Sequence, residues 1–310
     1  MKILIVASYH QNGFAPFVLE QANALESKGH QVDFFAVHGG GVKGYLRQLS
    51  LLRQRIKAFR PAVIHAHYGL SGLLANLQRM VPTVTTYHGS DLDDPKARPY
   101  SMMAVRLSAW NVFVSQKMIE KVKPKRRFSL LPCGVCLVDS QMVEKKQARQ
   151  GLGLLPDGKY VLFAGAFDNP VKNYDLAQKV IQKTMDGRVE VLELKGYSRE
   201  EVNRLMCAVD ALLMTSHREG SPQVIKEAMA CGCPIVSVDV GDVGERLKGL
   251  EGCYVSQTRD PDTLARLLEK AMAFEGKTKG RERIVQDALD NRQVAEELTT
   301  IYQRVQKKYR

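Results

Sequence analysis

The sequence lacks any run of about 20 apolar residues, which is the length that a helix needs to cross a bilayer. It also lacks the features of a signal peptide, because the apolar segment Met1–Ala7 is short and no cleavage-type sequence follows it. That segment is typical of an opening β-strand. We therefore expect a cytoplasmic protein without a membrane-spanning segment.

Cysteine is also sparse, with six residues among 310. Two pairs lie close in sequence: Cys133 with Cys136, and Cys231 with Cys233. A structural zinc site needs about four ligands at suitable spacing, and a redox pair is expected at the start of a thioredoxin-like helix. Cys133 instead follows an apolar strand and a proline. We expect buried or partly buried thiols with neither role.

Acidic residues are scarce in the first half of the chain. Residues 1–150 hold 21 Lys and Arg against 9 Asp and Glu, whereas the second half holds 24 of each, so the whole net charge of +12 lies in the first half. A field of one sign favours an anionic partner such as phosphate groups, an anionic membrane surface or nucleic acid. The uneven charge thus points to the first half as the part that meets such a partner.

Two basic stretches carry most of this charge. Val42–Arg60 predicts one helix with Leu46, Leu49, Leu52, Ile56 and Phe59 on an apolar face, flanked by Lys43, Arg47, Arg53, Arg55, Lys57 and Arg60. Lys117–Arg127 adds six further basic residues. They are either solvated faces or a surface that docks on anionic lipid and favours a lipid-linked or polyanionic acceptor. Because these stretches match no recognised nucleic-acid-binding motif, we expect no nucleic acid.

Strand and helix patterns alternate along the chain, which is typical of a parallel sheet with helices on both faces. Six strands are predicted in the first half: Lys2–Ala7, Gln31–Val37, Ala62–His67, Thr83–Tyr87, Asn111–Ser115 and Phe128–Leu131. A polar, turn-rich stretch at Asp139–Asp157 follows. The alternation then restarts with strands Tyr160–Gly165, Val189–Leu194, Ala211–Thr215 and Pro234–Val238 and with helices Tyr174–Met185, Ser198–Ala208, Pro222–Ala230 and Asp262–Phe274.

This pattern predicts an α/β protein of two Rossmann-like, doubly wound domains, at residues 1–140 and 150–290. Ligands of such sheets bind at the carboxyl ends of the strands, where loops lead into helix N-termini. We expect the site in the loops Ser8–Gly13, Tyr87–Asp91, Gly165–Asn173 and Ser216–Pro222 and at Tyr197, facing a cleft between the domains.

Two nucleotide-binding motifs are formally present but lack the context that they need. Gly39–Gly44 matches G-x-G-x-x-G, yet no acidic residue ends the next strand near His67, so a dinucleotide site is not expected. Gly153–Lys159 resembles a P-loop, but Tyr160 replaces the Ser or Thr that would hold magnesium. We interpret both as ordinary loops.

Metal sites are equally weakly indicated. Asp91 and Asp93 form a D-x-D that could bind a divalent cation, but a helix-capping loop after the preceding strand is the favoured interpretation. His65 and His67 are too few ligands by themselves. We predict no metal site.

The most informative segment is His217–Gly232, which follows a predicted apolar strand. Gly220, Ser221 and Pro222 open a helix whose free N–H groups suit sugar hydroxyls or phosphate oxygens. Glu219 lies just before this helix and Glu227 lies within it, so that the two carboxylates could bind separate hydroxyl groups of one ligand. From the residues alone, a capping Glu219 and a surface Glu227 are equally acceptable.

These residues resemble the retaining glycosyltransferases of GT-B fold, family four (group 1 type). The resemblance extends over nearly the whole chain through four further segments: Thr86–Asp91, Leu131–Val135, Asn169–Asn173 and Ser237–Glu245. It implies a first domain that binds the acceptor, a second that binds the nucleotide-sugar, and a last helix at 292–308 that packs back on the first domain. Such motifs are specific for the family and not for its substrate.

The resemblance assigns several residues to the nucleotide. Lys172, aided by Arg218, would neutralise the departing diphosphate, which is the main electrostatic task in such a reaction. Glu227 would bind the ribose. Gly13 would line the phosphate side of the site, and Tyr197 would lie near the base.

Other residues are assigned to the transferred sugar. Glu219 would face it beside the backbone of Gly220 and Ser221, and His88 would lie near the anomeric carbon. The resemblance thus implies three catalytic residues: His88, Glu219 and Lys172. The implied reaction is a retaining transfer of a hexose-type sugar from a UDP-sugar to a lipid-linked, polysaccharide or other glycan acceptor, as in cell-envelope polysaccharide biosynthesis. It would need neither a metal nor a cofactor.

One departure from the family pattern bears on this reaction. Ala166 and Phe167 occupy the region where the family usually has an Arg that partners the Lys, so diphosphate binding would rest on Lys172. The departure supports an alternative, in which the chain is a non-catalytic protein that binds a nucleotide-sugar. A metal-dependent transferase that uses Asp91 and Asp93 is a further alternative.

Overall fold

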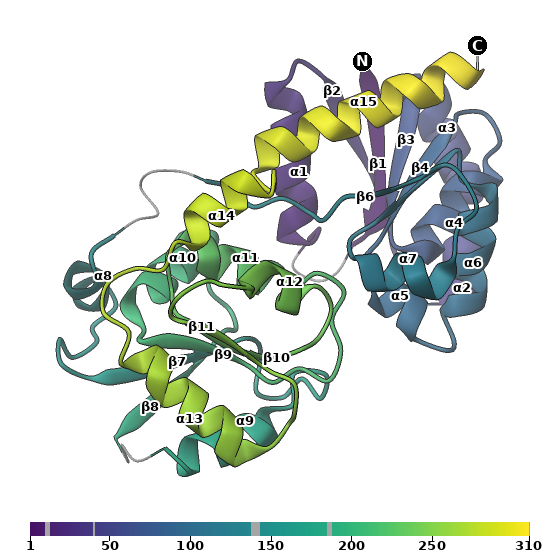
Figure 1. Ribbon diagram of the computed structural model, residues 1–310. Coiled ribbons are helices and arrows are strands. Elements are labelled where there is room, and N and C mark those ends of the chain that lie inside the picture. The colour runs from purple at the N-terminus through teal and green to yellow at the C-terminus, as the bar shows by residue number, and fades with distance from the viewer. Residues whose placement is uncertain (10–12, 40, 138–142, 185–187, 310) are drawn as a thin grey trace. The chain divides into compact units, whose positions relative to one another are not determined.

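The computed structural model describes residues 1–9, 13–39, 41–137, 143–184 and 188–309 and divides the chain into two compact units. The first unit comprises Met1–Gly134 and Leu289–Arg310, and the second comprises Val135–Ala288 (Figure 1). The chain therefore leaves the first unit once and returns to it for the last helix. The polar stretch predicted at Asp139–Asp157 begins with residues outside the described part.

The first unit is built on a six-stranded parallel sheet with the strand order β2-β1-β3-β4-β5-β6. Its strands are β1 (Lys2–Ser8), β2 (Gln31–Val37), β3 (Val63–His67), β4 (Thr83–Tyr87), β5 (Trp110–Phe113) and β6 (Phe128–Leu130). Every residue of β3 and β4 is buried, as expected for central parallel strands covered on both faces. The six strands predicted from the sequence are all present, with ends that shift by one or two residues.

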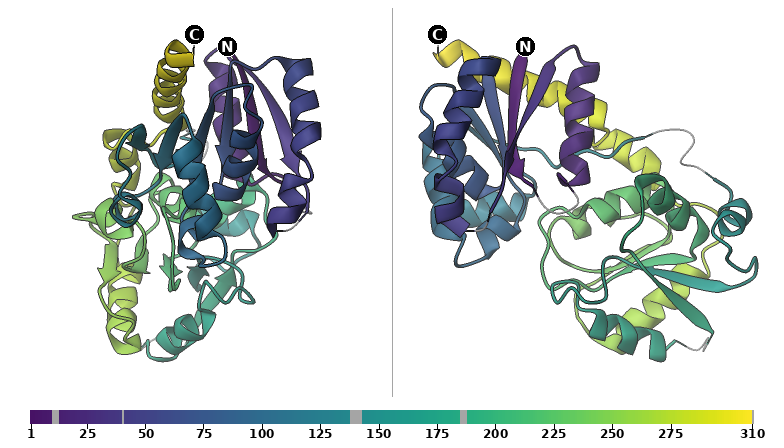
Figure 2. Two further views of the ribbon diagram at one scale, coloured as in Figure 1. Left: turned by 90° about the vertical axis from the view of Figure 1, so that its right-hand side faces the viewer. Right: turned by 180° about the vertical axis from the view of Figure 1, so that it is seen from behind.

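Eight helices of the first unit cover this sheet. They are α1 (Pro16–Ser27), α2 (Gly41–Leu46), α3 (Leu49–Phe59), α4 (Gly69–Leu77), α5 (Ser90–Asp93), α6 (Arg98–Leu107), α7 (Gln116–Val122) and α15 (Asn291–Tyr309). The last helix, α15, lies beside α1 along one face of the sheet (Figures 1 and 2). A proline at the first position of α1 suits that helix start, because its missing N–H would have no partner there.

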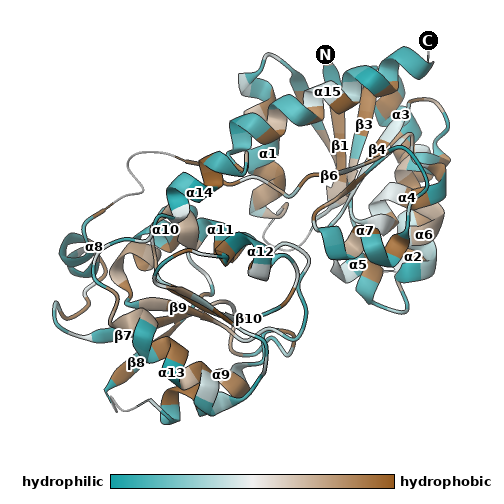
Figure 3. Ribbon diagram, in the orientation of Figure 1, coloured by the Kyte–Doolittle hydropathy of each residue, from teal (hydrophilic) through white to brown (hydrophobic). Residues whose placement is uncertain are grey.

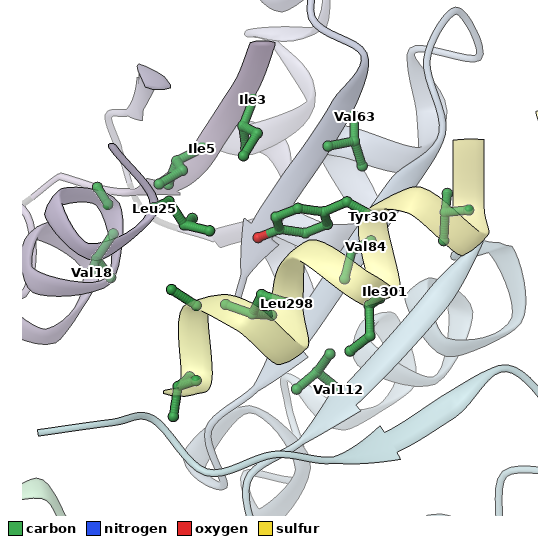
Figure 4. Packing of buried hydrophobic residues seen from close by; sticks show 14 of the residues in the cluster. Ile3, Ile5, Val18, Leu25, Val63, Val84, Val112, Leu298, Ile301 and Tyr302 are labelled. Atoms are coloured by element: carbon green, nitrogen blue, oxygen red, sulfur yellow. The ribbon is translucent and has the colours of Figure 1, made fainter. Parts of the chain in front are cut away.

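Strand β1 separates two hydrophobic cores because its side chains alternate between the faces of the sheet. Ile3 and Ile5 pack with residues of α1 and with Leu298, Ile301 and Tyr302 of α15 (Figure 4). Leu4 and Val6 point to the other face of the sheet, where they pack with residues of α3 and α4. The helix from the end of the chain thus completes the core that the first strand begins.

The second unit holds a five-stranded parallel sheet with the order β11-β10-β9-β7-β8. Its elements are α8 (Lys145–Gly151), β7 (Lys159–Phe163), α9 (Tyr174–Gln182), β8 (Val189–Glu193), α10 (Arg199–Ala208), β9 (Ala211–Met214), α11 (Gln223–Ala230), β10 (Ile235–Val238), α12 (Val243–Leu247), β11 (Cys253–Ser256), α13 (Pro261–Met272) and α14 (Gly280–Gln286). The strands β9 and β10 are hydrophobic, and α13 turns polar residues outward (Figure 3). The predicted two-unit, parallel α/β fold is therefore confirmed.

Short-range sequence signals fix several helix ends in the second unit. Ser198 accepts the N–H of Glu201, and the Glu201 carboxylate accepts the N–H of Ser198, which completes the predicted capping box of α10. Asp260 caps α13 in the same manner through the N–H of Thr263. The elements α8, α12, β11 and α14 were not predicted, and α8 lies within the stretch Asp139–Asp157 that was expected to be turn-rich.

The prediction of one helix over Val42–Arg60 is wrong. The helix breaks at Arg47 and Gln48, where the Gln48 side chain donates to the carbonyls of His38 and Gly44. The break separates α2 from α3 and leaves the Leu46 side chain 39% exposed, outside the apolar face that it was assigned to. Gly40 of the glycine motif and Met185, the predicted end of α9, lie outside the described residues.

No helix in the described residues is both long and apolar enough to cross a membrane. None of the six cysteines is joined in a disulfide bond, and all are buried except for the half-buried Cys136. Their burial confirms the prediction of buried or partly buried thiols.

Candidate functional site

The candidate site of the second unit lies at the carboxyl ends of four neighbouring strands. Loops after β7, β8, β9 and β10 carry Lys172, Tyr197, Glu219 and Asp242 respectively. Parallel strands bring their carboxyl ends to one edge of the sheet, which is where such folds bind ligands. The predicted residues of this unit therefore share one edge.

Lys172 and Glu219 form an ion pair at this edge. Nζ of Lys172 lies 2.7 Å from Oε1 of Glu219, and the two side chains are only 21% and 16% exposed. Partial burial strengthens the attraction between the charges and leaves room for solvent or a ligand at one side. Sequence reasoning gave the two residues separate roles, and the structure brings them together.

The loop that carries Lys172 is tied to the end of β9. Oγ1 of Thr215 donates to the carbonyls of Lys172 and Asn173, and Asn173 adopts a left-handed conformation with φ of 57°. Gly165 faces the aliphatic stem of Lys172, where an added Cβ would lie 2.7 Å from Cγ. These contacts hold the backbone and the stem of Lys172 beside the end of β9.

The loop that carries Glu219 is held from the other side by the segment after β10. The α-carbon of Gly241 approaches this loop so closely that an added Cβ would lie 2.4 Å from the carbonyl oxygen of Gly220. Oγ of Ser221 donates to Asp242 at 2.8 Å and lies 3.2 Å from Nζ of the buried Lys226. The Ser221 side chain is therefore engaged by the protein, and its backbone is the part left to serve a ligand.

Glu227 is buried within α11 and is not a surface residue, although the sequence alone allowed either. Its carboxylate is 8% exposed and accepts from Nη1 of Arg199, the first residue of α10. Tyr197, two residues earlier, is 42% exposed, and Arg218 is also exposed. Sequence reasoning missed Arg199, although its place at the start of α10, after β8, puts it at the same edge.

In the first unit, His88 follows β4 and lies among aromatic rings. Its ring centroid lies 4.4 Å from that of Tyr68, 4.8 Å from Phe17 and 5.3 Å from His67. Nε2 of His88 lies 3.1 Å from Nδ1 of His67, and Nδ1 lies 3.8 Å from Sγ of Cys133. Both ring nitrogens of the half-buried His88 therefore contact the protein.

The buried histidines behind His88 hold its ring. Burial lowers the pKa of His67 to about 3, so this ring is neutral. Its Nε2 has no hydrogen-bond partner among the described residues. Nδ1 of His67 and Nε2 of His88 share one hydrogen bond, in which the tautomers of the two rings decide which one donates.

A third histidine extends this network to the last helix. Nδ1 of His65 lies 2.7 Å from the hydroxyl of Tyr302 in α15, and its Nε2 lies 2.7 Å from Oγ1 of Thr86. Burial, with the neighbouring histidine charges, lowers the pKa of His65 well below its usual value. The pair His65 and His67 is thus a neutral, buried support behind His88.

Asp91 caps the turn that follows His88. Oδ1 accepts the N–H groups of His88 and Gly89, at 3.1 and 3.0 Å, and Oδ2 accepts that of Gly69 at 2.9 Å. Burial raises the pKa of Asp91 to about 6, although these N–H groups favour the charged form. Asp93 forms an ion pair with Lys121. The capping interpretation of Asp91 is confirmed, and the described residues contain no cluster of three metal-ligating side chains.

Gly13 marks the end of the first strand-to-helix loop. It has φ of 97°, and an added Cβ would meet no atom within 4 Å. His10–Asn12, which complete the loop predicted to line the phosphates, lie outside the described residues. Gly13 and His88 belong to the first unit and the other predicted site residues to the second.

Family comparisons cover both units. Residues 11–138 match the model described as Glycosyltransferase Family 4, and residues 160–273 match the model described as Glycosyl transferases group 1. The chain belongs to the family 4, group 1 glycosyltransferases. This finding confirms the resemblance that the sequence motifs indicated.

Individual relatives of this chain are distant. The chain is 27% identical over 244 residues to a D-inositol 3-phosphate glycosyltransferase of Mycobacterium marinum, an alignment that covers 63% of this chain and 52% of the relative. It is also 27% identical over 212 residues to TuaC of Bacillus subtilis, named for teichuronic acid biosynthesis, with 59% and 54% covered. The matched part spans about half the length of these relatives.

Solved structures resemble the family 4 glycosyltransferase over nearly its whole length. Sucrose-phosphate synthase of Thermosynechococcus elongatus superposes with a TM-score of 0.78 at 16% identity, covering 98% of this chain and 99% of that one. HepE of Anabaena, solved with UDP, gives a TM-score of 0.72 at 15% identity, with 97% and 99% covered. At such identities the likeness establishes the GT-B fold class alone.

Proposed function

We propose that this chain is a retaining, metal-independent hexosyltransferase that moves a hexose-type sugar from a UDP-sugar to a glycan or lipid-linked acceptor. The observation that carries the proposal is the Lys172–Glu219 ion pair of 2.7 Å, set beside the start of α11. It places a cation, a carboxylate and a helix N-terminus together, which suits a ligand with both a diphosphate and a sugar.

The choice of donor and acceptor draws on proteins of similar fold and sequence. The Anabaena protein HepE was solved with UDP and also with UDP and glucose. Two relatives are named for polysaccharide biosynthesis: TuaC for teichuronic acid and AmsK of Erwinia amylovora for amylovoran. These names support a UDP-sugar and an envelope glycan as the substrates to test first.

In the proposed reaction, Lys172 turns from Glu219 to the diphosphate of the donor. Its positive charge, with that of Arg218, stabilises the charge that develops on the leaving UDP. Glu219 then binds hydroxyl groups of the sugar beside the backbone of Gly220 and Ser221. The leaving group departs and the acceptor attacks on one face of the sugar, so that the anomeric configuration is retained.

Four residues complete the proposed donor site. Glu227, held by Arg199, binds the ribose, and Tyr197 lies near the base. His88 contacts the transferred sugar from a ring position that His67 and Cys133 hold. Gly13, which carries no side chain, leaves room on the phosphate side.

We further propose that the basic surface of the first unit meets an anionic acceptor or the inner face of the membrane. Part of the charge counted in the sequence has a structural partner: Arg55 pairs with Asp33 at 2.6 Å, Lys121 pairs with Asp93, and Arg53 donates to carbonyls of α4 and of Gln78. The apolar residues Leu52 and Ile56 are buried in the core. Docking would therefore rest on charge and weaken as salt rises.

Product analysis of the full chain tests the central proposal. UDP-, GDP- and ADP-sugars are first ranked by the rise in melting temperature that each produces, because a ligand bound by the native state alone raises stability. Turnover of the best donor should persist in EDTA, and NMR should find the donor's anomeric configuration in the product. Inverted product would disprove retention, and loss of activity in EDTA would disprove metal independence.

Glu219→Ala separates catalysis from mere binding. The variant should lose donor turnover and donor hydrolysis, while Asp168→Ala should keep both. Asp168 is a matched control because it forms an equally short ion pair with Lys195 in the same unit, but at 72% exposure. If the wild type binds the donor without any turnover, the chain is a nucleotide-sugar-binding protein instead.

A further inference from the structure

A small cavity lies at the amino-terminal edge of the first sheet, away from the loops described above. It has a volume of about 180 Å³ and is lined by Ala109 and Trp110 at the start of β5, Arg127 just before β6, and Val305 and Lys308 of α15. Both chain termini lie near this edge of the sheet (Figures 1 and 2). Because His88 follows the carboxyl end of β4, it belongs to the opposite edge.

The aromatic wall of the cavity is held in place. Nε1 of Trp110 donates to Oγ of Ser129 at 3.1 Å, and part of the indole packs against the core shared by β1, α1 and α15. An indole fixed in this way offers apolar surface without losing side-chain entropy when a ligand arrives. Such a surface suits the C–H face of a sugar ring.

Two cations stand beside this indole. Arg127 and Lys308 are exposed, and neither forms an ion pair within the part of the chain that the structure describes. Arg127 has φ of 58°, and its carbonyl accepts the N–H of Asn111, so its backbone is anchored. No acidic residue lines the cavity. The lining therefore combines a fixed aromatic surface with uncompensated positive charge.

A second, larger cavity of about 320 Å³ in the other unit lacks this combination. Glu251 and Glu282 lie among its lysines and its arginine, and Lys277 and Arg283 donate to the backbone carbonyls of Val143 and Lys248. Its cations are thus offset or already engaged. The comparison makes the Trp110 cavity the better site for an anion.

We propose that the Trp110 cavity binds one acidic sugar unit, a pyranose ring that carries a carboxylate or a phosphate. Drug-sized ligands fill roughly 300 Å³ or more, so this cavity suits a single substituted ring. Arg127 and Lys308 bind the anionic group through charge-assisted hydrogen bonds, and the indole covers the ring. A nucleic acid is less suited, because strand binding uses successive aromatic platforms and Trp110 is the chain's single tryptophan.

This site goes beyond the proposed function. It would retain an acidic unit of a glycan on the first unit, at a sheet edge that the donor residues do not occupy. Its occupation requires neither UDP-sugar turnover nor the roles given to Lys172 and Glu219. Failure of either hypothesis can therefore be recognised separately.

Tryptophan fluorescence of the full chain tests the site directly, since every change reports on Trp110. Sodium glucuronate and glucose 6-phosphate should each give a saturable change with Kd on the order of 1 mM. Glucose and inorganic phosphate should bind at least tenfold more weakly, because each offers half of the recognised chemistry. Equal binding of glucose and glucuronate would overturn the proposal.

Variants locate the binding. Arg127→Gln and Lys308→Gln should each weaken glucuronate binding at least fivefold, and Lys307→Gln, an exposed neighbour outside the lining, should not. Trp110→Phe should weaken glucuronate binding as well. Calorimetry measures binding in this variant, because it lacks the single tryptophan. Melting temperatures and donor turnover should match the wild type in the glutamine variants. The site would be refuted if glucuronate binding were unchanged in both Arg127→Gln and Lys308→Gln. It would also be refuted if the fluorescence responded only to polyuridylate, as a nucleic acid, or only to phosphatidylglycerol vesicles, as an anionic membrane.

Discussion

The two units prepare their candidate residues by opposite electrostatic means. Around His88, the buried ring partners His67 and His65 are neutral, and the nearest carboxylate, Asp91, is satisfied by backbone N–H groups. Around Lys172, partly buried charges are paired with one another. A neutral network suits contact with an uncharged sugar, whereas paired charges can be exchanged for those of a diphosphate. The difference suggests a division of labour between sugar and nucleotide that mutations can test.

The largest effect is expected from Lys172→Ala. Removal of the cation should lower kcat/KM about 1,000-fold and weaken UDP binding, because the leaving diphosphate loses its main counter-charge. Steady-state kinetics and calorimetry with UDP measure both. Lys195→Ala, which breaks the exposed pair with Asp168, is the matched control and should leave both values unchanged.

His88→Ala should produce the complementary pattern. We expect kcat to fall about 10- to 100-fold while the Kd for UDP stays at the wild-type value, since His88 is assigned to the sugar and not to the nucleotide. The same two assays compare it with Lys172→Ala. If UDP binding weakens equally in both variants, the proposed division of labour is wrong.

Gly241→Ala tests how firmly the Glu219 loop is held. The new Cβ would lie 2.4 Å from the Gly220 carbonyl oxygen, so the loop must shift, and we expect a raised donor KM and a loss of about 1–3 kcal/mol of stability. Gly249→Ala is a close control, because Gly249 also has positive φ but open space around it. It should lose stability through backbone strain alone and keep its KM.

Arg199→Ala should act through Glu227. Without its partner, the buried carboxylate loses its position, and the donor KM should rise about tenfold with kcat changed less than threefold. Arg199→Lys should restore part of the affinity. Arg204→Ala serves as the control, since Arg204 pairs with Glu200 on the solvent side of the same helix. A larger effect on kcat than on KM would place Arg199 in the chemical step.

The smallest expected effect is on the pH dependence of stability. His65 and His67 have lowered pKa values in the folded chain. Below pH 6.5 these two rings therefore take up protons in the unfolded chain that they do not bind in the folded chain. The raised pKa of Asp91, about 6, lets the folded chain bind one proton that the unfolded chain lacks until nearer pH 4. The two histidine shifts should therefore lower the stability as the pH falls below 6.5, and the Asp91 shift should offset part of this loss between about pH 6 and 4.

Urea unfolding between pH 7 and 4, followed by hydrogen exchange in peptides of each unit, measures this slope. His67→Gln should make the slope shallower in the first unit, because it removes a ring that binds a proton in the unfolded chain and not in the folded one. An unchanged slope in His67→Gln would show that the buried histidines do not set the acid sensitivity.

Sequence patterns predicted features that depend on near neighbours. The alternating strands and the Ser198–Glu201 capping box are such features, and the Glu219 and Glu227 spacing identified the family. The break at Gln48 was missed because it depends on hydrogen bonds to His38 and Gly44. The Arg199–Glu227 pair and the His65–Tyr302 contact join residues 28 and 237 positions apart, and no local pattern encodes such pairings.

The return of α15 to the first unit has a consequence for biosynthesis. During translation, Ile3 and Ile5 must wait for Leu298, Ile301 and Tyr302 before their hydrophobic core can close. The second unit, which is one continuous stretch from Val135 to Ala288, is synthesised completely in the interval. The unit that begins the chain is thus the last to be finished. Its apolar surface stays uncovered until α15 has been made, and a nascent chain truncated before α15 would present that surface to chaperones and proteases.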